Sequence, residues 1–100
     1  MFGSILIHPQ AKKFKKKRPG LVVSLYEFNC TTMFAIICPI TSTIKNLPTR
    51  YSLPKDLDTK GQVLISQLKS LDFKERKLKK VENLPLQDMA KIDQIIQYIF

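Results

Sequence analysis

Three short segments of the sequence carry side chains that could act on a phosphate group. The first, KKFKKKR at residues 12–18, puts six basic side chains into seven positions and is followed by Pro19. The second, CPITS at 38–42, ends an apolar run on two adjacent hydroxyls, and the third is SQLKSLD at 66–72. Ammonium and guanidinium groups attract polyanions, and hydroxyl groups donate hydrogen bonds to phosphate oxygens. The chemistry that these residue types favour is therefore the handling of phosphate.

The charge of the chain favours the same class of ligand. Its formal net charge is +9 and its isoelectric point is near 9.8. Residues 1–50 carry eight Lys or Arg against the single acid Glu27, whereas residues 51–100 carry nine against seven. Phosphate-rich polymers, acidic proteins and anionic membrane surfaces are natural partners of such a chain, and the first half should meet them. A basic run alone is typical of a solvated face, but beside hydroxyl-bearing strand ends it favours a nucleic-acid contact.

Size and composition predict one domain, residues 1–100. With 44% hydrophobic and 25% charged residues in 100, the chain has room for one modest core and should gain stability by pairing with a second copy. Cys30 and Cys38 form no CxxC motif and His8 is the one histidine, so we expect neither a disulfide scaffold nor a zinc site, and a reducing cytosol fits best. The longest apolar run, 33–40, is too short to span a bilayer, and no secretory signal is expected.

The elements that must position these residues are short strands followed by one helix. Turn residues separate β-branched runs, which predicts a mainly β, α+β fold built on a small antiparallel sheet or barrel with strands at 4–8, 21–26, 33–38, 49–54 and 62–68. Residues 71–78 indicate a short helical turn, followed by a last strand at 79–83. Apolar residues then recur at helical spacing from Met89 to Ile99, with Pro85 at the helix start, which predicts a helix that packs on the sheet.

Taken in order, the three segments resemble the MazF/PemK/Kid family of toxin endoribonucleases. The matching features are the RP at 18–19 before an apolar strand, the PITS at 39–42, the KGQVLISQLKSLD at 60–72 and the closing segment LPLQDMAKIDQIIQYI at 84–99. The resemblance implies an SH3-like antiparallel β-barrel with a C-terminal α-helix, as in CcdB and PemK. It also implies a cytoplasmic homodimer that binds single-stranded RNA (mRNA) in its grooves, and a type II toxin–antitoxin system with a cognate antitoxin. The excess of positive charge predicts that the inhibiting segment of this antitoxin is acidic.

The resemblance further implies cleavage without a metal or other cofactor, in which the 2′-hydroxyl of the RNA attacks and leaves a 2′,3′-cyclic phosphate and a 5′-hydroxyl. Arg18 matches the catalytic arginine of the family and Thr41 its catalytic threonine, with Ser42 as a second donor to phosphate. The expected substrate-binding residues are Lys16, Lys17, Lys45, Gln67 and Lys69. Gln67 is also a candidate brace for its strand end, and Arg50 a candidate for the RNA track or a solvated residue.

The sequence also departs from the family pattern. Ser66 stands where many members carry an acid, and the loop before Pro19 is shorter and built of lysines. Three groups are therefore candidates for the general base: Arg18 with a depressed pKa, His8, and a residue of a partner chain. Two other functions stay open, a toxin of the same fold that poisons DNA gyrase without needing Arg18 or Thr41, and a non-catalytic RNA-binding module.

Overall fold

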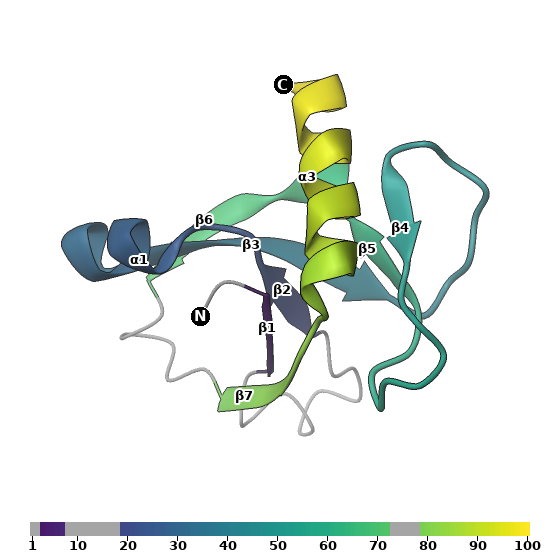
Figure 1. Cartoon of the computed structure of the whole chain (residues 1–100), viewed down its shortest axis with the longest axis horizontal. Helices are drawn as coiled ribbons and strands as arrows, with labels where there is room; N and C mark the ends of the chain where they lie inside the picture. Colours follow the sequence, from purple (N-terminus) through teal and green to yellow (C-terminus); the bar gives the residue numbers. More distant parts are fainter. Residues whose placement is uncertain (1–2, 8–18, 73–78) are drawn as a thin grey trace.

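The computed structural model describes residues 3–7, 19–72 and 79–100. In this part of the chain the strands are β1 (Ser4–Ile7), β2 (Gly20–Val22), β3 (Phe34–Thr41), β4 (Arg50–Ser52), β5 (Gln62–Leu64), β6 (Lys69–Asp72) and β7 (Lys79–Asn83). The helices are α1 (Tyr26–Thr32), the short 3-10 helix η2 (Ile65–Gln67) and α3 (Leu86–Ile99). Figure 1 shows α1 and β4 at opposite ends of the molecule, with α3 rising between them.

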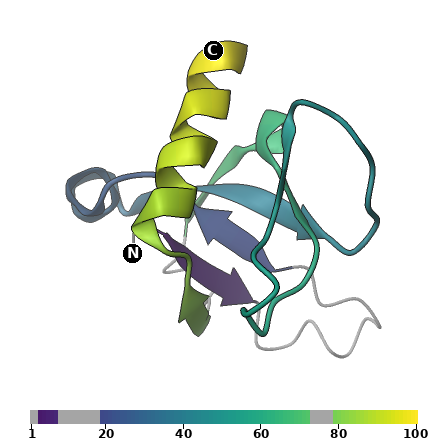
Figure 2. The same ribbon diagram turned by 45° about the vertical axis from the view of Figure 1, so that its right-hand side comes forward.

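β3 is the strand around which the sheet is organised. The order of the antiparallel strands is β4-β5-β3-β2-β1-β7, and β6 pairs with β3 as well. One edge of β3 pairs with β2, and the other pairs first with β6, as in Ala35 with Leu71, and then with β5, as in Ile40 with Val63. The strand path runs from β4 to β7 without closing on itself, so the predicted barrel is a strongly curved, barrel-like sheet (Figure 2).

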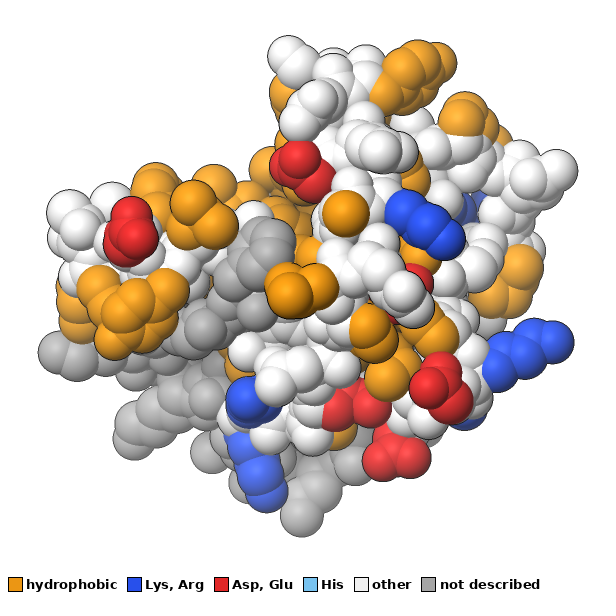
Figure 3. Space-filling model, in the orientation of Figure 1, with side chains coloured by type: hydrophobic (Ala, Val, Ile, Leu, Met, Phe, Trp, Pro, Cys, Tyr) orange, Lys and Arg blue, Asp and Glu red, His pale blue; other side chains and the backbone are white. Residues whose placement is uncertain are grey.

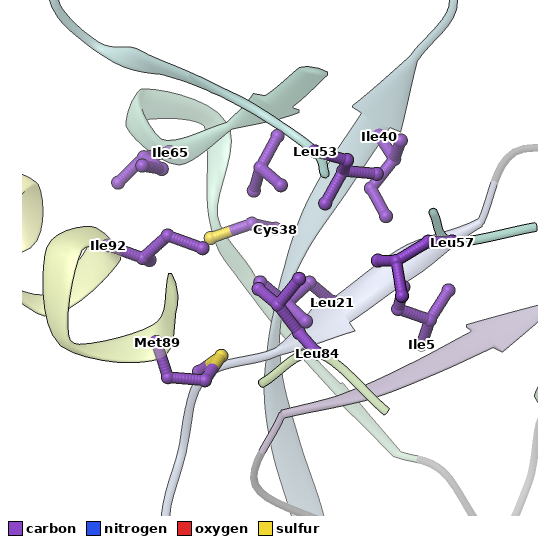
Figure 4. Packing of buried hydrophobic residues seen from close by; sticks show 11 residues of the cluster. Ile5, Leu21, Cys38, Ile40, Leu53, Leu57, Ile65, Leu84, Met89 and Ile92 are labelled. Carbon is purple, nitrogen blue, oxygen red and sulfur yellow. The ribbon is translucent and has the colours of Figure 1, made fainter. Parts of the chain in front are cut away.

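The main core lies between one face of this sheet and α3. Because side chains alternate along a strand, Cys38 and Ile40 of β3 share this face, and Ile92 of α3 points toward Cys38 (Figure 4). The buried cluster consists of Ile5, Leu21, Cys38, Ile40, Leu53, Leu57, Val63, Ile65, Leu84, Met89 and Ile92. Burying one such side chain contributes about 1.5–3 kcal/mol, so this cluster holds the helix on the sheet.

The opposite face of the sheet carries a smaller cluster. Leu6, Val22, Ala35 and Ile37 are buried there, and Leu71 packs against them. Strands near the middle of the sheet are thus buried on both faces. This second face also carries the polar side chains of the candidate site.

The predicted C-terminal helix is confirmed. α3 follows Pro85, and Met89 and Ile92 are its buried apolar residues. Asp88 in the first turn is buried and accepts a hydrogen bond from the Tyr51 hydroxyl of β4. Burial, together with the hydrogen bond to Asp88 and the charge of that carboxylate, raises the pKa of Tyr51 to about 12. The Tyr51–Asp88 pair ties the start of the helix to the sheet.

The predicted strand at 21–26 is too long, because β2 ends at Val22 and α1 follows. The Ser24 hydroxyl accepts a hydrogen bond from the Ile36 N–H at 3.0 Å and donates one to the buried Asn29 side chain, which turns the chain away from the sheet. Met33 ends α1 in the left-handed region at φ 64°.

The other predicted elements are partly confirmed. The strand predicted at 62–68 stops at Leu64 and continues as η2, and the strand at 33–38 extends to Thr41. The strand at 79–83 is confirmed. The helical turn predicted for 71–78 begins inside β6, and 73–78 lie outside the described residues. In the part that the structure describes, no helix is long and apolar enough to cross a membrane.

Candidate active site

The candidate site is built at the end of β3. Thr41 is the last residue of the strand, half-buried and paired with Gln62 of β5. The Thr41 Oγ1 accepts a hydrogen bond from the Thr43 N–H at 3.2 Å. A hydroxyl has one proton to donate and two lone pairs, so this contact leaves the Thr41 proton free for another acceptor. Ser42 is exposed beside it.

Gly61 sets the distance between β5 and the Thr41 backbone. Its φ is +125°, and a Cβ placed on it would lie 2.1 Å from the Thr41 carbonyl oxygen. The Gly61 carbonyl accepts a hydrogen bond from the Leu53 N–H at 3.0 Å. No side chain fits between the two strands at this point, so glycine is required for the approach.

Three polar side chains form a row across neighbouring strands. Thr41 of β3 pairs with Gln62 of β5, and Gln62 pairs with Ser52 of β4. The residues beside them, Ile40 and Val63, face the main core, so the row faces the other way. Gln62 is nevertheless only 5% exposed. The loop 42–49 therefore covers it.

The amide of Gln62 makes three hydrogen bonds to that loop and to β4. Its Oε1 accepts hydrogen bonds from the Lys45 N–H at 3.0 Å and from Arg50 Nη1 at 3.3 Å, and its Nε2 donates to Ser52 Oγ at 3.1 Å. Arg50 Nη1 also donates to the Thr43 carbonyl oxygen at 2.9 Å. Figure 1 shows the loop as a wide arch between β3 and β4, and these two side chains connect it to the sheet. The Lys45 side chain is exposed on the arch.

Several predicted site residues lie outside the described residues, namely His8, Lys16, Lys17 and Arg18. The described chain resumes at Pro19, whose carbonyl oxygen accepts a hydrogen bond from the Ile40 N–H at 2.9 Å. The next residue, Gly20, pairs with Pro39. Pro19 and Gly20 therefore lie beside the strand end that carries Thr41.

The remaining predicted residues lie along the neighbouring strands. Lys69 is exposed and pairs with Ile37, four residues before Thr41, which is about 13 Å along the strand. Gln67 is exposed in η2. The structure thus brings Thr41 and Ser42 together with the loop 42–49, which carries Lys45. Lys69 lies apart from them.

Sequence reasoning missed the roles of Gln62 and Gly61. One signal for Gln62 was available, a glutamine at the head of the buried run VLI. Its partners could not be read from the sequence, because they depend on strand register. Within the described ranges, no group of three or more His, Cys, Asp or Glu side chains is placed to hold a metal ion.

Comparison with solved structures finds the same fold in bacterial toxins. Deinococcus radiodurans MazE–MazF (Form-II) is similar with a TM-score of 0.84 at 28% identity, covering 98% of this chain and 91% of that chain. MazF (Form-I) from the same organism has a TM-score of 0.82 at 29% identity, and the match covers 97% of this chain and 92% of that chain. An endoribonuclease in complex with its cognate antitoxin from Mycobacterial species has a TM-score of 0.82, covering 98% and 91%, and at 19% identity it shows the fold alone.

A search of curated proteins found no sequence that matches this chain. The model of one protein family, described as PemK-like, MazF-like toxin of type II toxin-antitoxin system, matches residues 5–100. This match spans all three segments on which the resemblance was based. The chain belongs to the PemK-like, MazF-like family of toxins of type II toxin–antitoxin systems.

Proposed function

We propose that this protein is a sequence-selective endoribonuclease that cuts single-stranded RNA without a metal ion. The observation that carries the proposal is the pairing of Pro19 with the end of β3. We assign Arg18, which is covalently bonded to Pro19, to the same phosphate as the Thr41 and Ser42 hydroxyls. An arginine and two hydroxyls are a set of donors suited to a phosphodiester.

The reaction needs only groups that RNA and protein supply. The 2′-oxygen attacks the adjacent phosphorus and its proton passes to a base, while the bond to the 5′-oxygen breaks and that oxygen takes up a proton. Arg18 binds two phosphate oxygens through its planar fork, and the Thr41 hydroxyl donates to the charge that develops on them. One preorganised donor of this kind contributes about 10²–10³ in rate. The base is proposed to be Arg18, His8 or a residue of a partner chain, because Ser66 replaces the family acid.

The proposal extends to the assembly. The Deinococcus relative is crystallised as MazE–MazF, and the net charge of +9 here favours an acidic antitoxin segment that covers the basic surface. A homodimer is supported by large apolar side chains that are exposed on the chain, which Figure 3 shows gathered on the projecting lobe of α1. They include Leu25, Tyr26, Phe28 and Met33.

The test is incubation of the purified chain with a long single-stranded RNA in excess EDTA, followed by mapping of the fragment ends. We expect cuts at a recurring short motif with 5′-hydroxyl ends. Thr41→Val, which keeps the side-chain volume, should cut at least about a hundredfold more slowly, and Arg18→Ala should not cut measurably.

Two outcomes would contradict the proposal. RNA that stays intact but binds with a steep dependence on salt would identify a non-catalytic binding module. Growth inhibition that survives loss of both Arg18 and Thr41, with DNA gyrase trapped on its DNA, would identify a gyrase poison.

A further inference from the structure

A buried glutamine on the outer face of the sheet requires an explanation. Gln62 is 5% exposed, and its amide makes three hydrogen bonds, none of which belongs to the main core. A leucine or valine would suit a buried strand position without any need for partners. The glutamine instead uses three of its four hydrogen-bonding positions on the loop 42–49 and the strand that follows it.

The loop has few other attachments to the sheet. Within the described residues, the backbone–backbone hydrogen bonds of residues 43–47 join residues that are close in sequence. An example is the Leu47 N–H, which donates to the Lys45 carbonyl oxygen at 3.1 Å. Two contacts connect this stretch to strand side chains across the arch, the Lys45 N–H to Gln62 Oε1 and Arg50 Nη1 to the Thr43 carbonyl. Residues 42–48 are all exposed, so packing does not fix their conformation.

The peptide groups of Thr43 join this brace to the candidate catalytic hydroxyl. Its carbonyl oxygen accepts from Arg50 at 2.9 Å, and its N–H donates to Thr41 Oγ1 at 3.2 Å. Arg50 is itself oriented by Gln62 Oε1 at 3.3 Å. A chain of hydrogen bonds therefore runs from Gln62 through Arg50 and Thr43 to Thr41. The last of these bonds occupies a lone pair of Oγ1 and so directs the hydroxyl proton away from the loop.

We propose that Gln62 and Arg50 are positioning residues for RNA cleavage, which hold Thr43 so that the Thr41 hydroxyl points at the scissile phosphate. This inference rests on the proposed function. Neither residue contacts the reacting atoms. Their effect is on geometry, and a misplacement of about 1 Å in a catalytic group lowers a rate by about a hundredfold.

The experiment compares the steady-state kinetics of cleavage of one RNA by wild type, Gln62→Met, Gln62→Glu and Arg50→Met. Methionine matches glutamine in length and cannot hold Lys45 or Arg50, whereas glutamate keeps an acceptor for both. The matched control is Gln94→Met on the exposed face of α3. Circular dichroism at the assay temperature checks that every variant is folded.

We expect Gln62→Met and Arg50→Met to lower kcat by about tenfold to a hundredfold with KM within about threefold of wild type. Gln62→Glu should recover most of kcat, since it restores the acceptor for the Arg50 guanidinium. The kcat of the double variant Gln62→Met/Arg50→Met should be little lower than that of either single variant, because both residues act through Thr43. The amide of Lys45 should exchange faster with solvent in Gln62→Met than in Gln94→Met.

A merely structural role would give a different result. If folded Gln62→Met keeps the kcat of Gln94→Met, or if Gln62→Glu is as slow as Gln62→Met, the inference is overturned while the proposed function stands. If the wild type leaves RNA intact, the proposed function fails and this inference fails with it.

Discussion

Replacing Gly61 by alanine would put a methyl carbon 2.1 Å from the Thr41 carbonyl oxygen. Ordinary contact begins near 3.4 Å, so the two atoms must separate by about 1.3 Å. The obstacle is backbone of β3, and it cannot rotate away as a side chain would. The strands β3 and β5 must therefore move apart at the residue pair Thr41 and Gln62.

Two terms contribute to the expected loss of stability. An L-residue held at φ +125° is strained by about 1–3 kcal/mol, and the steric clash adds about 1–3 kcal/mol. We expect Gly61→Ala to lower the free energy of unfolding by about 4 kcal/mol, which for a domain of this size lowers the Tm by about 16–32 °C. The cleavage rate of the folded variant should fall too, because Thr41 moves.

Gly3→Ala is the matched control. Gly3 also has a positive φ, +80°, but its added Cβ would meet the Leu84 carbonyl oxygen and Met89 at 3.4 Å, an ordinary contact. It should lose about 2 kcal/mol from backbone strain alone. Urea unfolding of both variants measures the difference. If Gly61→Ala is no more destabilising than Gly3→Ala, the close approach of β5 to Thr41 does not constrain the site as argued.

Three further predictions concern the core, the β4–β5 loop and the thiols. Ile92→Ala should lower the free energy of unfolding by about 2–5 kcal/mol in urea titrations, and a loss equal to that of Ile92→Val, about 1 kcal/mol, would contradict the packing of α3. The Thr59 hydroxyl lowers the pKa of Glu82, and the Thr59 N–H, which donates to the carboxylate at 2.6 Å, lowers it less. The contact therefore stabilises the fold at pH values above the pKa of this carboxyl in the unfolded chain. The stabilisation is lost as the pH falls through the lower pKa of the folded chain. Hydrogen exchange of the Thr59 amide should therefore lose protection in acid in wild type but not in Glu82→Gln. At about pH 8 a thiol reagent should label exposed Cys30 and spare buried Cys38, whose pKa burial raises to about 12; labelling of both before unfolding would contradict this.

The C-terminal helix could be predicted from the sequence because its signal is local. Residues between Met89 and Ile99 repeat at the helical period, and a polar face and Pro85 accompany them. The start of β5 was found for a similar reason, because its residues open a buried apolar run. Local patterns fix an element when one face of it must be buried.

α1 could not be predicted in this way. Leu25 and Tyr26 were predicted as the end of a strand at 21–26, yet both are exposed and Tyr26 begins α1. The chain leaves β2 at Ser24, whose hydroxyl donates to the Asn29 side chain and accepts from the backbone of β3. Such contacts between separate elements leave no periodic pattern in the sequence.

The candidate site shows the same division. Thr41 and Ser42 were found by their place in a family motif, but Gln62 was not, although it pairs directly with Thr41. Its role arises from strand register and from a loop that folds back over the strand. Gln67, which sequence reasoning preferred as a brace, is exposed.

The two ends of the strand order bear on the solubility of the protein. Among the described residues, β4 and β7 each pair with one other strand, so each is an edge of the sheet in this part of the chain. Such edges are templates on which other chains add strands and aggregate. β4 is only three residues long, and β7 begins with the exposed Lys79 and Lys80. Because β4 is short and the lysines of β7 repel each other, neither edge should pair readily with the edge of another copy of the protein as its concentration rises.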